Sequence, residues 1–544
     1  MVFLLAAIPL FSQEASSPIG DLSPIGDTEE SAEVFSPPVE DASPITDDAL
    51  QPFSPDDSML YVIVDYQYSV KGITRPFALL YKLVENGEFR KGKIITGTAN
   101  LEKYISDIAQ IYINQLVLKD NAEVSYSTGS RNEDGTYPVT ILIKVEDAWN
   151  LIALPLPYYK NGVFNLTIKA RDYNFLGTMN SLRIDLGYGY NGNEEQPHSF
   201  LSGVFFDIPF NFLGYYWNFT FDNTVQYRFK APVYYENTTG ISMDLPFRST
   251  TFTFGFNEKL YVNRENSGWA KAAGYEAYQG LYMSSNPYVS WRIPTGFTVS
   301  QFGDLAYTPS MSATINHEFP LWPLPDDRKG PVMNFSHSLG FGKIDWHANY
   351  REGLSFSMGN SYQYDFYRKI YDISFDFTGI GHHIVKDFFA VSARLMYRYW
   401  YSSDVTSKGS YISYNLRGIS DTSILAYQAL TLNLDFPVRL FAFTPSKWFN
   451  NNKLRLFDLE VHAAPVIDLA LYREKDFDGE KTLYHHAGYA ATGGLELMIF
   501  SSFIRSLYVR LGFAIDIKEF LTARPIRIPG GEHREIYFIM GHFY

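Results

Sequence analysis

From Ala148 to the C-terminus, large apolar side chains alternate with polar or very small ones at a period of two residues. The alternation is clearest in four segments, SLRIDLGYGY, TFTFGFN, LTLNLDF and SLYVRLGFAIDI. Successive side chains of a β-strand point to opposite faces, so each segment is expected to be a strand with one apolar face. Helical periodicity is almost absent here, which restricts this region to a sandwich or a barrel of such strands.

Three features favour a transmembrane barrel over a soluble sandwich. The apolar face recurs along the whole region with almost no helix. Its positions are crowded with Phe, Tyr, Leu and Trp, in a chain that is 17% aromatic, as the aromatic girdles of membrane barrels require. Long polar loops such as NRENSGWAKAAG and REKDFDGEKT alternate with short turns. A membrane strand with its share of a turn and a loop takes roughly 25 residues, so we expect an antiparallel barrel of about 16 strands over residues 148–544.

Composition narrows the possible partners and chemistry. The formal net charge of −14 argues against a nucleic-acid partner, because phosphate binding needs a positive field. The 544 residues include no cysteine, which excludes disulfides, thiolate metal sites, thiol nucleophiles and a lipid-anchored cysteine. The chain has no run of 18 or more apolar residues, so a membrane-spanning helix is not expected.

No pattern typical of catalysis or metal binding is found. The segment SHSLG has Ser in place of the first Gly of a nucleophile elbow and lies in an alternating strand. The histidine pairs 382–383 and 485–486 are adjacent in sequence, so the two rings of each pair would face opposite sides of a strand. We therefore expect no enzyme, no cofactor and no metal site.

Two N-terminal segments precede the folded part of the chain. Residues 1–15 contain an apolar core of signal-peptide length, although they lack a positively charged start and a clean cleavage site. The alternatives are a misplaced start codon or a truncated leader. Residues 16–58 are rich in Ser, Pro, Asp and Glu and are expected to be a disordered acidic linker, with a short docking motif as the alternative.

Residues 59–147 predict a small α+β domain with the order β-α-α-β-β. Thr74 is expected to cap a first helix that has Pro76 in its first turn and ends before Gly87. A second helix follows Thr98, and the segment NEDG predicts the final hairpin. The apolar face of the first helix is predicted to consist of Phe77, Leu80, Tyr81 and Val84.

The order of these elements resembles a POTRA domain, the periplasmic module of outer-membrane assembly and secretion proteins. Several barrel segments also resemble, in order, the BamA/TamA-type barrels of that superfamily. The segment RDYNFLGTMNSLRIDLGYG is similar to an early barrel motif, with Asn174, Gly177 and Thr178 matching and Met179 standing where the family usually has Gly. Together the resemblance extends from Met59 to Tyr544.

The segment NLRGIS resembles the tip of loop 6 in that family, carried here by Leu416, Arg417, Gly418 and Ile419, with Ile419 in place of an aromatic residue. The resemblance implies that this loop folds into the barrel lumen and that its Arg contacts acidic residues on the inner wall. Asp468 matches the family's inner-wall Asp. This chain has Asn433 and Asp435 where the family often has a Glu and an Arg, and Asp435 is expected to substitute for the missing Glu. An ordinary exposed hairpin is the alternative.

The last strand resembles the signal by which outer-membrane barrels are recognised for assembly. It ends on the aromatic Tyr544, with Phe538 and Met540 on the same face. The seam of the barrel would join WNLIALPLPYYK to REIYFIMGHFY, and the family's first and last strands pair poorly and can part.

The resemblance implies a protein of the outer membrane of a Gram-negative-type bacterium, with its POTRA-like domain in the periplasm. The expected function is insertion, assembly or translocation of proteins. The expected partners are membrane lipids, unfolded outer-membrane or secreted proteins, and periplasmic accessory proteins at the POTRA-like domain. A two-partner secretion transporter is the alternative within the superfamily, and a passive porin or surface adhesin is the alternative from a different class.

Overall fold

A computed structural model of the chain describes residues 59–86, 88–89, 91–160, 163–191, 198–228, 233–247, 250–262, 281–299, 302–321, 323–324, 328–404, 409–419, 424–477, 483–504, 508–522 and 533–540. The expected signal peptide, the expected linker and Tyr544 lie outside these residues.

The described residues form one small sheet, one large barrel and a few short helices. The small sheet contains β1 (Leu60–Lys71), β2 (Ile94–Thr96), β3 (Glu123–Thr128) and β4 (Tyr137–Glu146). The helices are α1 (Pro76–Glu85), α2 (Thr98–Asn114), α4 (Pro445–Trp448) and α5 (Ile517–Thr522), and the 3-10 turns are η1 (Phe175–Gly177), η4 (Ser413–Asn415) and η5 (Asn452–Phe457).

The strands of the barrel and of its lumenal loop follow in chain order. The first half of the barrel contains β5 (Leu151–Lys160), β6 (Val163–Asp172), β7 (Leu182–Asn191), β8 (His198–Phe212), β9 (Tyr215–Arg228), β10 (Tyr234–Phe247), β11 (Thr250–Val262), β12 (Leu281–Thr298) and β13 (Asp304–His317). The second half contains β14 (Pro331–His347), β15 (Tyr350–Asp365), β16 (Ile370–Lys386), β17 (Phe389–Ser402), β20 (Gln428–Asp435), β21 (Val438–Phe443), β22 (Leu459–Phe477), β23 (Leu483–Ser501), β24 (Tyr508–Asp516) and β25 (Arg534–Met540). The loop strands β18 (Ser410–Tyr411) and β19 (Leu425–Ala426) pair only with each other.

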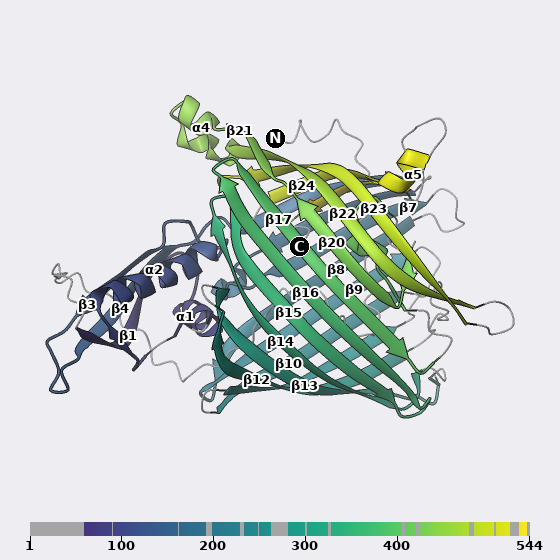
Figure 1. Cartoon of the computed structure of the whole chain (residues 1–544), viewed down its shortest axis with the longest axis horizontal. Helices are drawn as coiled ribbons and strands as arrows, with labels where there is room; N and C mark the ends of the chain where they lie inside the picture. Colours follow the sequence, from purple (N-terminus) through teal and green to yellow (C-terminus); the bar gives the residue numbers. More distant parts are fainter. Residues whose placement is uncertain are drawn as a thin grey trace.

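The N-terminal domain is a four-stranded sheet covered by two helices, and it lies at one end of the barrel (Figure 1). The sheet order is β2-β1-β4-β3, with β1 parallel to β4. Helix α2 buries Leu101, Tyr104 and Ile108, as its apolar spacing predicts. These side chains pack in one core with Val139 and Ile141 of β4. The small α+β unit expected from the sequence is therefore present, but its order is β-α-β-α-β-β, because the short strand β2 lies between the two helices and pairs with β1.

Helix α1 differs from the sequence expectation at its start. It begins at Pro76 with Arg75 as its N-cap, and no side chain caps it. Thr74, which was expected to be the cap, instead donates a hydrogen bond from its hydroxyl to Asp147 at 2.6 Å. A tertiary contact has therefore replaced the local cap.

Helix α1 also presents a different face to the domain core. The core side chains are Ala78, Leu79 and Leu83, whereas Tyr81 is only half-buried and does not belong to this core. The ring of Tyr81 stacks on Tyr216 of the barrel, with 4.1 Å between ring centroids. The predicted apolar face was wrong for Tyr81, because this helix also has an apolar contact with the barrel.

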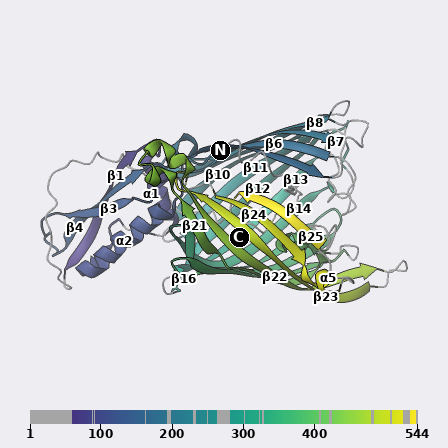
Figure 2. The same ribbon diagram turned by 90° about the horizontal axis from the view of Figure 1, so that it is seen from above.

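The barrel is closed and antiparallel (Figures 1 and 2), and the strand order places β25 next to β5. Its described residues form nineteen strand segments. Because β20 and β21 both pair with β17 and β22, these segments fill eighteen positions around the barrel. This number exceeds the expected 16. The estimate was low because turns such as 213–214 and 387–388 take only two residues.

Side chains along each strand alternate between the barrel interior and the outer surface. On β22, Ile467, Leu469 and Leu471 are exposed on the outside, whereas Asp468 and Ala470 between them are buried. In a closed barrel the face opposite the outer surface is the lumen. The charged positions of the alternating segments therefore face inward.

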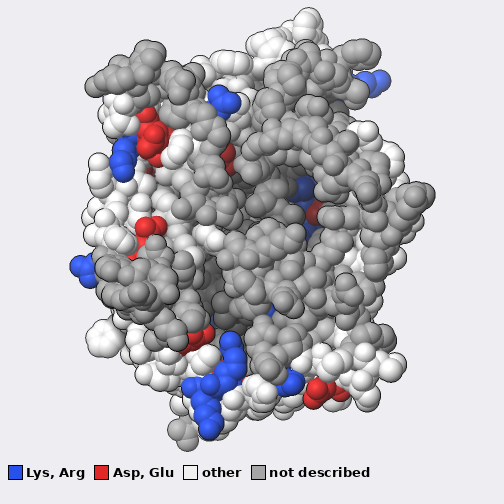
Figure 3. All heavy atoms as spheres, turned by 90° about the vertical axis from the view of Figure 1, so that its right-hand side faces the viewer, with Lys and Arg blue, Asp and Glu red and all other residues white. Residues whose placement is uncertain are grey.

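The two ends of the barrel differ. We call the end that contacts the N-terminal domain the proximal rim and the other end the distal rim. At the proximal rim, the Asn114 side chain donates to Asp345 at 2.8 Å and accepts from the backbone N–H of Trp346 at 2.9 Å. Figure 3 looks onto the distal rim and shows basic and acidic atoms inside a hollow of this face as well as around its edge.

None of the helices in the described ranges has both the length and the apolar character needed to span a bilayer.

Candidate functional site

The loop between β17 and β20 starts at the distal rim and folds into the lumen. Ile412, between β18 and η4, and Leu416 and Ile419, after η4, form a buried apolar surface on this loop. These residues pack against Ala470 of β22 and Ala490 of β23, which are small side chains on the lumenal face. Small residues on the wall thus leave room for the loop inside the barrel.

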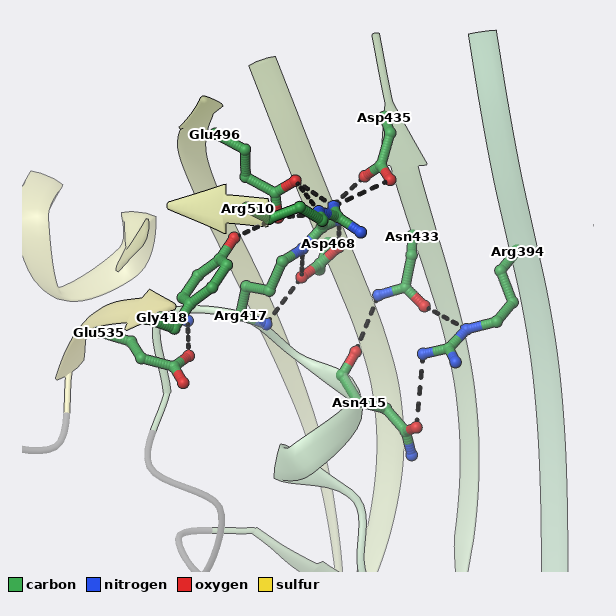
Figure 4. A network of polar contacts seen from close by, with 11 residues as sticks. Arg394, Asn415, Arg417, Gly418, Asn433, Asp435, Asp468, Glu496, Arg510 and Glu535 are labelled. Carbon is green, nitrogen blue, oxygen red and sulfur yellow. Dashed lines mark hydrogen bonds and ion pairs between the residues drawn. The ribbon is translucent and has the colours of Figure 1, made fainter. Parts of the chain in front are cut away.

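Arg417 lies at the tip of this loop and is 2% exposed. Its backbone N–H donates to Asp468 Oδ2 at 2.7 Å, and its Nε donates to the same oxygen at 3.0 Å, while Nη2 donates to Oδ1 (Figure 4). Its Nη1 donates to Asp435 at 2.6 Å and to Glu496 at 3.2 Å. The planar guanidinium therefore forms a bidentate pair with one carboxylate and reaches two more.

Gly418 allows the loop to turn against the wall. Its φ is +86°, a left-handed conformation that other residues rarely adopt. A Cβ added here would lie 2.7 Å from backbone atoms of both Ala514 and Ile515 on β24. The Gly418 N–H donates to Glu535 of β25 at 3.0 Å. Only glycine fits this approach of the loop to the last two strands.

A second ion pair completes the charged cluster. Glu496 accepts from Arg510 Nε at 2.8 Å and also from Arg510 Nη2. The Tyr537 hydroxyl donates to the other oxygen of Glu496. Gly512 lies between them in register, and a Cβ there would come within 2.1 Å of the Tyr537 ring. The ring passes over this glycine to reach the carboxylate.

Asn433 fixes the loop at a third point, on the far side of Arg417. Its side-chain oxygen accepts from Arg394 Nε at 3.0 Å, and its Nδ2 donates to the Asn415 carbonyl at 2.8 Å (Figure 4). Arg394 also donates to the Asn415 side chain at 3.4 Å. Two wall residues thus bind both the backbone and the side chain of the loop.

The carboxylates of the cluster compensate the desolvation cost of the buried guanidinium groups. Two buried arginines, Arg417 and Arg510, face the three carboxylates of Asp435, Asp468 and Glu496. An unpaired buried charge costs several kcal/mol by desolvation, so each cation needs such partners. The carboxylates come from β20, β22 and β23, and Arg510, Tyr537 and Glu535 come from β24 and β25. One loop therefore connects five neighbouring wall strands.

The structure brings together the residues expected for the loop motif and its two aspartate partners. It also adds residues that sequence reasoning did not select, namely Glu496, Arg510, Tyr537, Glu535 and Asn415. The sequence signal available for Glu496 was the period-two alternation, since it is the acidic residue of its strand and stands between the apolar Leu495 and Leu497. Their functional role stays a prediction.

The early barrel motif lies at the proximal rim, in the β6–β7 turn, away from the charged cluster. Asn174 is fully buried and donates to the Thr74 hydroxyl at 2.7 Å. Gly177, with a φ of +73°, accepts from the backbone N–H of Arg75 at 2.9 Å, and a Cβ on it would lie 2.0 Å from the carbonyl oxygen of Ile73. This turn therefore packs directly against the N-terminal domain.

Two other motif residues have different surroundings. The hydroxyl of Thr178 donates to the Phe175 carbonyl at 2.8 Å and stabilises the turn itself. Phe538 and Met540 belong to β25, where they pair with Leu511 and Val509 of β24. Their side chains lie outside the described structure, so the proposed C-terminal signal stays a prediction.

Comparisons with known proteins give remote likenesses only. No protein-family model and no curated protein matches the chain. It is similar to BamA from Haemophilus ducreyi lacking POTRA domains 1-3, with 11% identity and a TM-score of 0.33 over 88% of this chain and 85% of that one. It is also similar to CdiB from Acinetobacter baumannii, with 12% identity and a TM-score of 0.43 over 87% of this chain and 72% of that one. The siderophore receptor PirA from Pseudomonas aeruginosa has 8% identity and a TM-score of 0.32 over 73% of this chain and 72% of that one. These values do not separate one kind of barrel from another, so the function has to be argued from the chain's own residues.

Proposed function

We propose that this chain is an outer-membrane barrel of the BamA/TamA type that inserts or translocates other proteins through a seam between β5 and β25. The observation that carries the proposal is the charged cluster beside that seam. Among the described residues, its contacts join the lumenal loop to β20, β22, β23 and β25 and tie Arg510 of β24 to the same cluster, all on one side of the closure. A barrel whose wall is fixed up to β25 is suited to part between β25 and β5.

Short strands on both sides of the closure support the same proposal. Strands β5, β6 and β7 have 10 residues each, and β24 has 9, whereas β12 has 18 and β14 has 17. A strand of about 10 residues is just long enough to cross a bilayer. Fewer ladder hydrogen bonds therefore hold the barrel closed here than join its longer strands.

Two prolines on β5 further lower the number of ladder hydrogen bonds that this strand can make. Pro155 and Pro157 lie two residues apart on β5, so the backbone donors that they lack would both have faced the same neighbouring strand. In lipid, backbone groups have no water to bind, so a parted seam would present a strand edge that a nascent strand could pair with. Insertion then proceeds by β-strand addition, without covalent chemistry and without a cofactor.

The N-terminal domain would serve as the periplasmic receiving module. Its β3 forms an edge of the small sheet, where an extended segment of a substrate or an accessory protein could add as a further strand. The barrel strands would contact outer-membrane lipids through their outer face. The partners proposed are therefore lipids, unfolded outer-membrane or secreted proteins, and periplasmic accessory proteins.

Cysteine cross-linking across the seam tests the proposal, because the chain has no thiol of its own. Cysteine pairs are placed on residues 151–156 of β5 and residues 534–540 of β25, and a matched control pair is placed at Ser202 and Val225, which are partners across β8 and β9. Both kinds of pair are expected to oxidise. Only the seam disulfide is expected to stop assembly of client barrels in proteoliposomes. Full activity of the oxidised seam variant would exclude lateral opening.

Export of a dedicated protein through the lumen is the second candidate. The position of the N-terminal domain against the proximal rim favours it, because an exported chain would enter the lumen at that end. The same oxidised seam variant separates the two functions. Client insertion requires the seam to part, whereas export through the lumen continues with the seam locked and instead requires the loop of Arg417 to leave the lumen.

A further inference from the structure

A hairpin at the proximal rim carries a group of exposed aromatic residues. We call it the rim hairpin (residues 438–463, from β21 through α4 and η5 to the start of β22). Phe441 is 56% exposed, Trp448 60% and Phe449 71%. Strand β21 pairs with β17 only at Val438, so the rest of β21 extends beyond the neighbouring turn. Figures 1 and 2 place α4 at the outer edge of the proximal rim.

The aromatic residues continue the outer face of the barrel. Phe441 pairs with Val461 and Phe443 with Leu459, so both point to the same side as the odd-numbered residues of β22. That side is an unbroken apolar row of seven residues. The row consists of Leu459, Val461, Ala463, Pro465, Ile467, Leu469 and Leu471.

The length of this row matches a bilayer. Twelve residue steps at about 3.4 Å, on a strand tilted by about 40°, rise roughly 30 Å, which is the thickness of the hydrocarbon core. At its distal end the row gives way to Arg473, and at its proximal end, Leu459, it reaches α4 and η5 of the rim hairpin. The α4–η5 part of the hairpin therefore lies at the level of the lipid headgroups, where Trp and Phe side chains are favoured.

The rim hairpin is rigid enough to hold its aromatic side chains in place. Buried Asp458 accepts hydrogen bonds from the Ser446 backbone N–H at 3.0 Å and from the Ser446 hydroxyl. Its own carbonyl accepts from the Ser502 N–H at 3.0 Å, which fixes the hairpin to the next proximal turn. The rings of Phe443 and Trp448 pack edge to face at 4.9 Å. The exposed apolar surface is thus part of a fixed structure.

Residues 444–457 of the rim hairpin are net positive, whereas the whole chain is net negative. Residues 444–457 contain no acidic side chain, although the net charge of the chain is −14. Within them Lys447, Lys453 and Arg455 are all exposed. Basic residues beside exposed aromatic residues are typical of segments that lie on an anionic membrane surface, where each cation contributes about 1 kcal/mol of attraction.

We propose that the rim hairpin is an interfacial anchor that inserts its aromatic side chains among anionic phospholipids of the leaflet at the proximal rim. The aromatic side chains bury in the headgroup boundary, and the three cations pair with lipid phosphates. The anchor fixes the depth of the barrel wall beside the charged cluster. It goes beyond the proposed function, because any membrane barrel with this hairpin would bind lipid in the same way.

A fluorescent label tests this anchor in the whole protein. A single cysteine replaces Phe449, carries an environment-sensitive NBD group, and the barrel is reconstituted into vesicles of phosphatidylcholine with or without phosphatidylglycerol. We expect a blue-shifted emission that is quenched by lipids brominated near the headgroup. The control label at Glu133→Cys, an exposed position in the β3–β4 hairpin, is expected to keep its aqueous emission. Heat-modifiable migration in gels shows that each variant has formed its barrel.

The charges are tested by the triple variant Lys447→Gln, Lys453→Gln and Arg455→Gln. We expect it to lose the extra quenching that phosphatidylglycerol produces at position 449. Aqueous emission from position 449 in folded, inserted barrels would overturn the anchor and leave a protein partner as the occupant of this surface. Quenching that is equal in both lipids and unchanged in the triple variant would overturn the preference for anionic lipid. Neither result depends on whether the seam opens.

Discussion

Arg417 is a cation that binds its loop to the inner wall of the barrel, and its removal should release that loop. Arg417→Ala leaves the carboxylates of Asp435, Asp468 and Glu496 facing one guanidinium instead of two. Breaking a buried pair costs about 3–5 kcal/mol. A maleimide probe at Leu416→Cys, a position 2% exposed, should therefore react at least about a hundredfold faster in this variant.

A second substitution separates charge from packing. Asp468→Asn on the Arg417→Ala background removes one of the surplus carboxylates and should slow the labelling again. The control is Arg171→Ala, which breaks an ion pair with Asp185 between β6 and β7. That variant should label like the parent. Slow labelling of the Arg417→Ala protein would show that the apolar contacts and the hydrogen bonds of Asn415 and Gly418 hold the loop without this ion pair.

Gly418 permits a backbone approach that any side chain would prevent. Gly418→Ala should undock the tip, because its Cβ would lie 2.7 Å from backbone atoms of β24 that cannot give way. The matched control is Gly214→Ala in the β8–β9 turn. Gly214 has a similar φ of +79°, but nothing lies within 4 Å of the added Cβ. Both variants carry the strain of about 1–2 kcal/mol, so faster Leu416→Cys labelling only in Gly418→Ala isolates the steric effect.

At the scale of elements, the N-terminal domain has its own complete core. Both of its helices bury apolar side chains against the small sheet, so residues 59–147 should fold as an isolated fragment. Far-ultraviolet circular dichroism and a cooperative thermal transition provide the check. A random-coil spectrum would remove the POTRA-like interpretation of this segment.

The β6–β7 turn joins this domain to the barrel, and its glycine is the position to test. Gly177→Ala places a Cβ 2.0 Å from the Ile73 carbonyl, so the turn should separate from the domain. Limited proteolysis should then cut near residues 148–150 several times faster, while the barrel stays folded. Gly296→Ala is the control, because Gly296 has a φ of +81° and open space around its Cβ. Equal cleavage of the two variants would mean that the junction does not depend on this contact.

Period-two alternation was enough to predict the barrel and the direction of its side chains. It places Glu496 and Arg510 on the inward face, and the sequence resemblance pointed to the pairing of Arg417 with Asp468. It does not place Glu496 at the height of Arg417, because this depends on the register between strands. Register follows from turn lengths and hydrogen-bond ladders around the whole barrel, which no single strand encodes.

Helix α1 shows a second limit of local patterns. Its sequence has apolar residues on more than one face, and Tyr81 was assigned to the domain core when it in fact contacts Tyr216. A contact more than a hundred residues away along the chain cannot be read from a helical period. Thr74 was misassigned for the same reason, since its partners Asp147 and Asn174 come from distant segments.

For the whole molecule, the lumenal loop makes the two sides of the barrel closure mechanically unequal. Gly418 and Arg417 connect the loop to Glu535 on β25 and to carboxylates on β20, β22 and β23. Strands β20 to β25 are therefore held together by the loop, and β5 to β7 follow on the other side of the closure. If the barrel parts, relaxation should be concentrated in β5 to β7, while the strands bound to the loop keep their shape.

The difference between the two sides of the closure should appear in the rates of backbone hydrogen exchange. Backbone amides of β5 and β6 should exchange with deuterated water much faster than those of β22 and β23, since none of the described contacts of the Arg417 cluster reaches β5 or β6. Arg417→Ala should speed exchange in β22 and β23 and leave β5 and β6 nearly unchanged. Equal exchange on both sides of the closure in the parent protein would contradict this picture. With the expected asymmetry, a substrate strand meets one flexible edge, β5, and one fixed edge, β25. The fixed edge would then act as the template that sets the register of the new strand.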